Sequence, residues 1–326
     1  MILIAGLVAA AFSQLRSPGR PSKTIKLLIH RNQTVRQIGE TLAARQVIRS
    51  PALFVTLARV LGNSRDLRLG RYTLPLSISE YQALRVLRQG GEKNAFVTIP
   101  EGFTILQIAR RLATEQVCDS GSFLAACHDT ALLRRVQVNQ SSAEGYLFPD
   151  SYYLPYETTP EEIIGIMSRR FFTVYSSLSA GRNLQSSIFN LQSSILSLHE
   201  IVTLASIVEA EAERDSERAI VASVFLNRLK RGMHLQSCAT IEYLLPQRKA
   251  ILTDADTKIE SPYNTYLHPG LPPGPIGNPG KASLRAALYP AKSDYLFFVS
   301  KGDGRHHFSA TFAEHTAAQR RYQRKS

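Results

Sequence analysis

Two consecutive helices joined at a charged elbow are predicted for residues 197–232, and this stretch constrains the rest of the fold most strongly. Ser197 and Glu200 have the spacing of a capping box, in which each side chain accepts from a free backbone N–H at the helix start. An apolar run to Ala212 follows. A second start at Asp215 or Ser216 begins a helix that the glycine at position 232 ends.

The first of these helices is apolar on nearly all sides, which is typical of a helix in the middle of a domain. Helical spacing places Glu209 over Ala205 and Val202. Removal from water there would favour the protonated carboxyl, which is the form that a general acid needs. The alternative is a boundary glutamate that reaches solvent or pairs with Arg214 or Arg218.

Strand and helix patterns follow one another along the chain and predict an α+β fold in two domains. Residues 24–92 have the order strand, helix, helix, strand, with helix starts at Thr34 and Ser50. This order is similar to that of a LysM unit, the fold that grips N-acetylglucosamine chains. The skeleton T-x-x-Q-I-x-x-x-L-A at Thr34 recurs at Thr104, so a bare structural repeat is the alternative. Residues 93–326 are predicted to form a mixed α/β catalytic domain with a central buried helix.

The first 12 residues are wholly apolar, although a membrane span needs about 20 such residues. Basic residues follow at Arg16, Arg20 and Lys23. We predict that residues 1–16 belong to an N-terminal membrane anchor, truncated in this sequence, and that residues 17–23 are a linker. The alternative is a flexible N-terminus.

The net charge of +13 is spread along the chain rather than gathered in a basic block with interleaved aromatic residues. A polyanionic cell wall or membrane surface therefore suits it at least as well as nucleic acid, and no nucleic-acid partner is predicted. The cysteines Cys118, Cys127 and Cys238 lack the spacing of a zinc site or disulfide scaffold. We expect no metal and no cofactor.

Two segments carry side chains suited to sugars, which present apolar faces and outward hydroxyl groups. Residues 144–155 place the acids Glu144 and Asp150 beside rings such as Tyr146; an aromatic core strand is the alternative. Residues 261–280 are too rich in proline and glycine for a helix or central strand. They predict a rigid wall loop, or else exposed turns, and the loop would turn four side chains toward a groove: Tyr263, Asn264, Thr265 and Tyr266.

Several motifs agree on one family. In chain order they are EGYLFPDSYYLP, LASIVEAEAERDSERAIVASVFLNRLKRG, SPYNTYLHPGLPPGPIGNPG and FAEH, and they resemble the YceG-like (MltG) endolytic murein transglycosylases. The resemblance covers nearly all of residues 24–322. It implies a single-pass inner-membrane protein with a LysM-like part and a catalytic domain in the periplasm, which cuts nascent glycan strands internally.

The resemblance assigns the catalytic role to Glu209, within residues 206–211, and a groove-lining role to Gln236 and residues 263–266. The implied enzyme is a lyase that splits the MurNAc–GlcNAc β-1,4 bond without water, leaves 1,6-anhydro ends and so ends strand elongation. Glycan strands and peptidoglycan synthases are the implied partners. Two alternatives stay open: a muramidase, with Glu144, Asp150 or Glu213 as second carboxylate, and a non-catalytic wall-binding protein.

Overall fold

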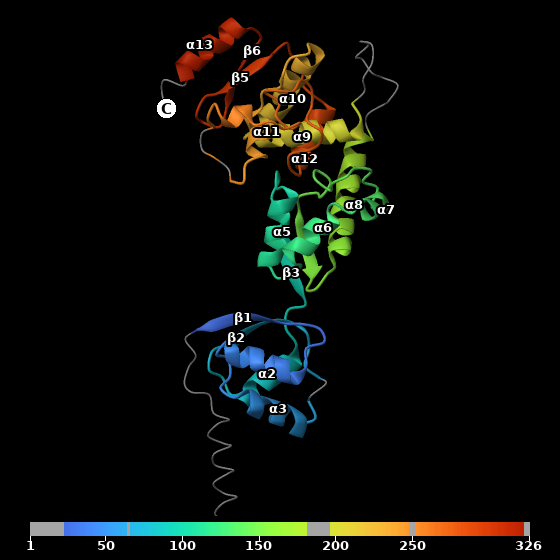
Figure 1. Ribbon diagram of the computed structural model, residues 1–326, viewed down its shortest axis with the longest axis vertical. Helices are drawn as coiled ribbons and strands as arrows, with labels where there is room; N and C mark the ends of the chain where they lie inside the picture. The colour runs from blue at the N-terminus through green and yellow to red at the C-terminus, as the bar shows by residue number, and fades with distance from the viewer. Residues whose placement is uncertain (1–22, 64–65, 181–195, 248, 250–251, 323–326) are drawn as a thin grey trace, which may run out of the picture. The chain divides into compact units, whose positions relative to one another are not determined.

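The computed structural model describes residues 23–63, 66–180, 196–247, 249 and 252–322, and mixes helices with small two-stranded sheets, which confirms the predicted α+β class (Figure 1). The chain divides into two compact units. Unit 1 contains the described residues up to Phe96 together with Glu115–Val117 and Tyr153–Thr158, and unit 2 contains the remainder. The predicted domain boundary between residues 92 and 93 stays a prediction.

Unit 1 has the predicted order of strand, helix, helix and strand. Its elements are β1 (Thr24–Ile29), α2 (Val35–Ala44), α3 (Pro51–Val60), β2 (Gly70–Pro75) and α4 (Glu80–Gln89). The strands β1 and β2 pair antiparallel, with Thr24 opposite Pro75 and Ile29 opposite Gly70. A capping box starts α2 at Thr34, as predicted, and another starts α4 at Ser79. The two strands and three helices enclose one apolar core around Leu42.

The middle of the chain supplies two strands and four helices. They are β3 (Asn94–Thr98), α5 (Ile105–Thr114), α6 (Ser120–Ala126), α7 (Thr130–Arg135), β4 (Ser151–Pro155) and α8 (Pro160–Ser179). β3 pairs with β4. Thr104 and Gln107 exchange the hydrogen bonds of a capping box, so the repeated sequence skeleton does mark the same kind of helix start in α2 and α5.

The central helix is α9 (Leu198–Glu211), which begins at the predicted Ser197 cap and is buried at every residue from Ile201 to Val208. Figure 1 shows it among the helices that contact it, α10 (Asp215–Lys230), α11 (Cys238–Glu242) and α12 (Lys281–Leu288). The remaining elements are η1 (Asp256–Lys258), β5 (Phe297–Ser300), β6 (His306–Ser309) and α13 (Phe312–Tyr322). The predicted central buried helix is therefore confirmed.

The predicted single-pass location in the inner membrane, with a periplasmic catalytic domain, is corrected here. Within the described ranges, none of the helices combines the length and the apolar character that a bilayer crossing demands. The apolar run behind that prediction has only 12 residues, short of the roughly 20 that span a bilayer. The predicted anchor, residues 1–16, and all but the last residue of the predicted linker lie outside the described residues.

Candidate functional site

Glu209 lies near the carboxyl end of α9 with only 7% of its side chain exposed. Its two carboxyl oxygens have different partners. Oε1 is 3.0 Å from Nη1 of Arg218, and Oε2 accepts from the backbone N–H of Gly280 at 2.9 Å. The sequence predicted that this side chain is buried among apolar residues, and gave pairing with Arg214 or Arg218 as the alternative. The side chain is buried, and it also pairs with Arg218. The carboxyl is buried, and an ion pair and a backbone hydrogen bond occupy its two oxygens.

Arg218 holds this carboxyl from the first turn of α10, and its own side chain is 9% exposed. Its guanidinium also donates to Asp215 Oδ1 at 2.8 Å and to Ser283 Oγ at 2.7 Å. A planar group with several donors can serve all three partners at once. Arg218 therefore links α9, α10 and α12 at one point.

A second carboxyl group, Glu101, lies beside Glu209 and was missed in the sequence. It follows Pro100 in the turn between β3 and α5 and is exposed. A methyl group on Gly280 would lie 1.9 Å from Oε1 of Glu101, and one on Gly102 would lie 3.4 Å from Cγ of Glu209. Gly280 links the two carboxyl groups, because its backbone N lies 2.9 Å from Oε2 of Glu209 and its methyl position lies 1.9 Å from Oε1 of Glu101. The backbone N and the Cβ position of one residue are about 2.5 Å apart, so these two oxygens are at most about 7 Å apart.

The electrostatic surroundings of Glu101 favour its protonated form. Partial burial raises the pKa of this carboxyl above its ordinary value of 4.5, and the nearby charges of Glu209 and Asp215 raise it further, against the opposing effect of Arg218. The only signal in the sequence was an acid between proline and glycine at a turn, which is too common to single out a site.

The loop before α12 positions Gly280, and Asn278 fixes this loop. The Asn278 side chain accepts from Leu147 N at 2.8 Å and donates to Phe103 O at 2.8 Å, while its backbone C=O accepts from Gly102 N at 2.8 Å. Ile276 N donates to Ser206 Oγ of α9 at 3.0 Å. The loop is thus fastened both to the turn that carries Glu101 and to the helix that carries Glu209.

Glu144, predicted to bind substrate, is 4% exposed and has its hydrogen bonds within the protein. It accepts from Ile105 N at the start of α5, from Asn278 Nδ2 at 3.0 Å and from Tyr243 Oη at 3.4 Å. Burial raises the pKa of this carboxyl to about 8, although those hydrogen bonds act in the opposite direction. Its position joins α5, α11 and the loop before α12.

Tyr146 is also buried, and its hydroxyl is 3.0 Å from Nδ1 of His199 on α9. The other ring nitrogen of His199 is 2.8 Å from the carbonyl oxygen of Pro273. Tyr146 and His199 therefore attach the wall loop to α9. Tyr263, which keeps part of its surface exposed, has its ring centroid 5.2 Å from that of Tyr243.

The other predicted binding residues divide between interior and surface. Asn264 is 0% exposed, so it does not face a groove: its side chain donates to the carbonyls of Thr257 and Ile259 and holds the loop closed. Thr265 is likewise buried. Gln236 is exposed, and Tyr266 is partly exposed with its hydroxyl 3.1 Å from Sγ of Cys238.

The remaining acids that were considered at the sequence level do not contact Glu209. Asp150 pairs with Arg170 of α8 at 2.8 Å on the surface. Glu213 lies beside Gly304 of the β5–β6 turn. Glu211 accepts from Ser237 Oγ, and burial raises the pKa of its carboxyl. Glu211 thus attaches the segment around α11 to α9. Glu209 is the acid of this motif that lies beside Glu101.

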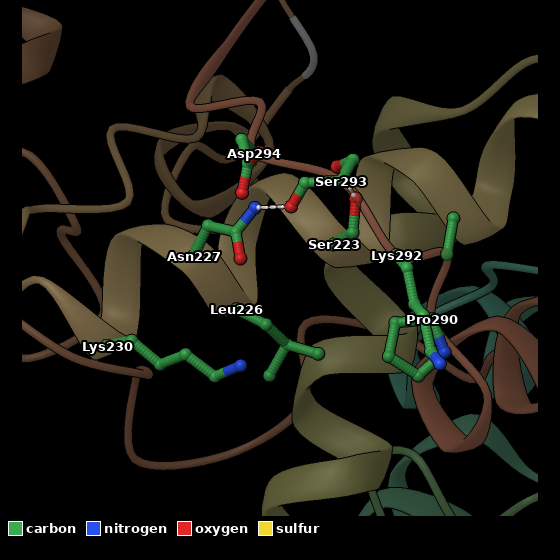
Figure 2. Close-up of a pocket in the computed structure, with 9 residues that line it drawn as sticks. Ser223, Leu226, Asn227, Lys230, Pro290, Lys292, Ser293 and Asp294 are labelled. Carbon is green, nitrogen blue, oxygen red and sulfur yellow. Dashed lines mark hydrogen bonds between the residues drawn. The ribbon is translucent and has the colours of Figure 1, made fainter. Parts of the chain in front are cut away.

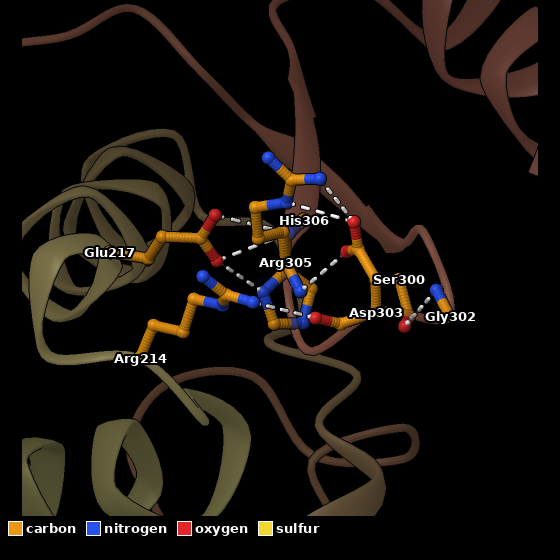
Figure 3. A network of polar contacts seen from close by, with 7 residues as sticks. All are labelled: Arg214, Glu217, Ser300, Gly302, Asp303, Arg305 and His306. Atoms are coloured by element: carbon orange, nitrogen blue, oxygen red, sulfur yellow. Dashed lines mark hydrogen bonds and ion pairs between the residues drawn. The ribbon is translucent and has the colours of Figure 1, made fainter.

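The β5–β6 hairpin is attached near the helical elbow by a polar network (Figure 3). Nδ1 of His306 lies 2.8 Å from Oε2 of Glu217, and the His306 backbone N–H donates to the same carboxylate. Arg214 donates to the carbonyl oxygen of Asp303 at 2.9 Å. These contacts are structural, because every polar group named here is satisfied by another part of the protein.

Comparison with known proteins decides the family. The family model described as the YceG-like family matches residues 27–321. The chain belongs to the YceG-like family. A relative from Bacillus subtilis (strain 168), named endolytic murein transglycosylase, is 30% identical over 338 residues, which cover 98% of this chain and 91% of the relative.

A second relative of this YceG-like protein carries the same name and comes from Streptococcus pneumoniae serotype 2 (strain D39). It is 32% identical over 309 residues, covering 85% of this chain but 54% of the longer relative. Among solved structures, that of a yceG-like protein from Listeria monocytogenes is similar with a TM-score of 0.62 and 30% identity, over 90% of this chain and 98% of the other.

This YceG-like protein has a surface hollow of about 470 Å³ whose lining does not include the carboxyl pair (Figure 2). Residues of α10, including Ser223 and Asn227, form one side, and the segment around Ser293 forms the other. Asn227 donates to the carbonyl oxygen of Ser293 at 2.7 Å across it. Neither Glu209 nor Glu101 lines this hollow, so it is not the candidate site.

Proposed function

We propose that this YceG-like protein is an endolytic peptidoglycan lytic transglycosylase. It cleaves the β-1,4 bond between N-acetylmuramic acid and N-acetylglucosamine in nascent strands and leaves 1,6-anhydro ends, which ends strand elongation. The observation that carries the proposal is the buried carboxyl of Glu209, held by Arg218 and Gly280 N–H beside the exposed Glu101. The names of the Bacillus and Streptococcus relatives support the same reaction.

The simplest mechanism uses one carboxyl group for two proton transfers. Glu209 gives a proton to the glycosidic oxygen as the bond to the anomeric carbon breaks, and the positive charge that develops there is stabilised by a carboxylate or by the substrate's acetamido oxygen. Glu209 then takes the proton of the muramic acid 6-hydroxyl, whose oxygen closes on the anomeric carbon. Water is not consumed, and the carboxyl ends as it began.

The proposed roles of the other predicted residues follow from their exposure. Gln236, Tyr263 and Tyr266 keep exposed surface and are proposed to contact the glycan. The buried residues Glu144, Tyr146 and Asn264 are proposed to hold the glycan-binding segments in place without touching the glycan. Asp150, which pairs with Arg170 on the surface, is proposed to act in the same indirect way. We also propose that residues 24–92 form a LysM-like glycan-binding domain, that residues 93–326 form the catalytic domain, and that peptidoglycan synthases are partners.

A muramidase is the second candidate, and the position of Glu101 favours keeping it. Glycoside hydrolases use two carboxyl groups that are about 5 Å apart for retention or roughly 6.5 to 9.5 Å apart for inversion. The upper limit of about 7 Å between Glu101 and Glu209 admits both spacings. The two enzymes differ in their products, because only the hydrolase adds water.

The test is digestion of purified murein, with the products weighed by mass spectrometry. Anhydro ends support the transglycosylase, reducing ends support the muramidase, and intact strands support a wall-binding protein. Glu209→Gln is expected to lower strand release at least about 10²-fold while the protein stays folded, since Arg218 keeps Asp215 and Ser283 as partners. The matched control is Glu161→Gln, an exposed acid at the start of α8. A fully active Glu209→Gln variant would contradict the assignment.

A further inference from the structure

We propose that the outer face of the β3–β4 ribbon in unit 1 is an additional glycan-binding site, where the rings of Phe96 and Tyr153 stack against sugar rings of a murein strand. The inference rests on the function proposed above, because that function makes a glycan strand the ligand. Three observations support it: the exposure of the two rings, the firm attachment of the ribbon, and the uncharged character of its outward side chains.

The two rings are large apolar groups that the fold leaves in solvent. Phe96 on β3 is 54% exposed, and Tyr153 on β4 is 75% exposed. Their ring centroids are 4.9 Å apart, and the ring planes are tilted by 48°. A cross-strand aromatic pair can stabilise a two-stranded ribbon by itself, but these exposures show that neither ring covers the other from solvent. The pair therefore offers two adjacent ring surfaces to a ligand.

The ribbon has one buried face and one exposed face, because successive side chains of a strand point to opposite sides. Ala95 and Leu154 are 0% and 1% exposed and face the interior. The outward side chains in unit 1 form what we call the aromatic platform: Asn94, Phe96, Tyr153 and Pro155. The sugar-binding rings predicted for residues 144–155 thus divide between two positions, since Tyr146 is buried and Tyr153 is on the platform.

The end of β4 is attached to the rest of unit 1 directly after the platform. The backbone N–H of Tyr156 donates to the carbonyl oxygen of Lys93 at 3.1 Å, and the Tyr156 side chain is buried. The next residue, Glu157, accepts from the backbone N–H of Arg31 at 3.0 Å. The strand that carries Tyr153 is therefore held in place before a ligand arrives, which reduces the entropy lost on binding.

The chemistry of the platform suits a neutral sugar chain. None of its four side chains is charged, so it lacks the cations that a phosphate-bearing polymer would need. Sugar rings present apolar C–H faces, which match the rings of Phe96 and Tyr153. The exposed amide of Asn94 can both donate to and accept from the hydroxyl and acetamido groups of such a chain.

The size of the exposed ring surface favours a narrow ligand over a second copy of the chain. An aromatic side chain has about 150–250 Å² of surface, so the exposed fractions leave roughly 200–320 Å² on the two rings together. A stable protein interface buries about 800 Å² on each partner. A protein partner would have to extend well beyond the platform, whereas a glycan strand would not.

The test uses a fluorescent reporter on the platform. The chain has no Trp, so Tyr153→Trp places the only indole of the protein there. The full chain, carrying Glu209→Gln to keep the probe intact, is titrated with chitohexaose, the β-1,4-linked hexamer of N-acetylglucosamine. The emission is expected to move to shorter wavelength and to saturate, because the sugar displaces water from the indole. Adding Phe96→Ala should weaken this binding about 10-fold, since one of the two rings is lost.

The matched control is Tyr295→Trp in unit 2. Tyr295 is 37% exposed and also pairs with a phenylalanine, since its ring centroid is 5.8 Å from that of Phe308. This pair is not on the platform, and the emission of Tyr295→Trp should not move when chitohexaose is added.

Three results would overturn the inference. The first is an emission of Tyr153→Trp that does not move. The second is an equal affinity with and without Phe96→Ala, and a lower melting temperature of that variant would then assign the pair to ribbon stability alone. The third is a dimer in sedimentation velocity that Phe96→Ala abolishes, which would assign the platform to a second copy of the chain.

The products from murein test the proposed function separately. Anhydro ends from the wild type together with an unmoved emission would uphold the transglycosylase and overturn the platform. Reducing ends together with a saturable shift that Phe96→Ala weakens would overturn the transglycosylase and uphold the platform.

Discussion

Glu144→Gln should change how the stability of this protein depends on pH. Burial raises the pKa of the Glu144 carboxyl from its ordinary 4.5 to about 8. A group whose pKa is raised in the folded state contributes stability that is fully present below its unfolded value and is lost as the pH rises through the folded value. Between pH 5 and pH 8 the wild type should therefore lose roughly 3 kcal/mol relative to the variant, because each pKa unit corresponds to about 1.4 kcal/mol.

The comparison isolates Glu144 because the other titrating groups are common to both proteins. Glutamine has nearly the same shape, and its amide oxygen can still accept from Ile105 N. The measurement is urea unfolding followed by far-ultraviolet circular dichroism, since the chain has no Trp. If the unfolding free energies of the wild type and Glu144→Gln differ by the same amount at pH 5 and at pH 8, the reasoning is refuted. The hydrogen bonds from Ile105, Asn278 and Tyr243 would then offset the effect of burial on the pKa of Glu144.

Two further changes test the site itself. Gly280→Ala should displace the flexible end of Glu101 beside Glu209 and lower murein cleavage, while the melting temperature changes little; an unchanged rate would contradict a role for this contact. Arg218→Met should lower the unfolding free energy by about 3 kcal/mol, because it leaves Glu209 buried without its ion-pair partner, and denaturant titration measures that loss. An equally stable Arg218→Met protein would show that the ion pair contributes nothing.

Local sequence signals predicted the helix starts well, because they depend on residues only three positions apart. The predicted capping boxes at Thr34 and Ser197 are both present, and so is the predicted cap at Ser50. The same locality explains why the predicted order of strand, helix, helix and strand is found in β1, α2, α3 and β2.

The predictions about single side chains at the site were less complete. Helical spacing correctly indicated that Glu209 is buried, but its partners come from α10 and from the loop before α12. Asn264 carries a polar group suited to sugars, yet the loop uses it internally, since a buried loop must satisfy its own backbone carbonyls. Residue type alone does not distinguish these two uses.

The sequence by itself determined where the helices begin, which of them is central, and the family to which the chain belongs, because each of these is written in short-range spacing and in contiguous motifs. Only the tertiary structure decided that Glu101 and Glu209, more than a hundred positions apart, lie beside one another. Their approach depends on two glycines and on Asn278 joining separate loops, and such long-range contacts leave no periodic trace in the chain.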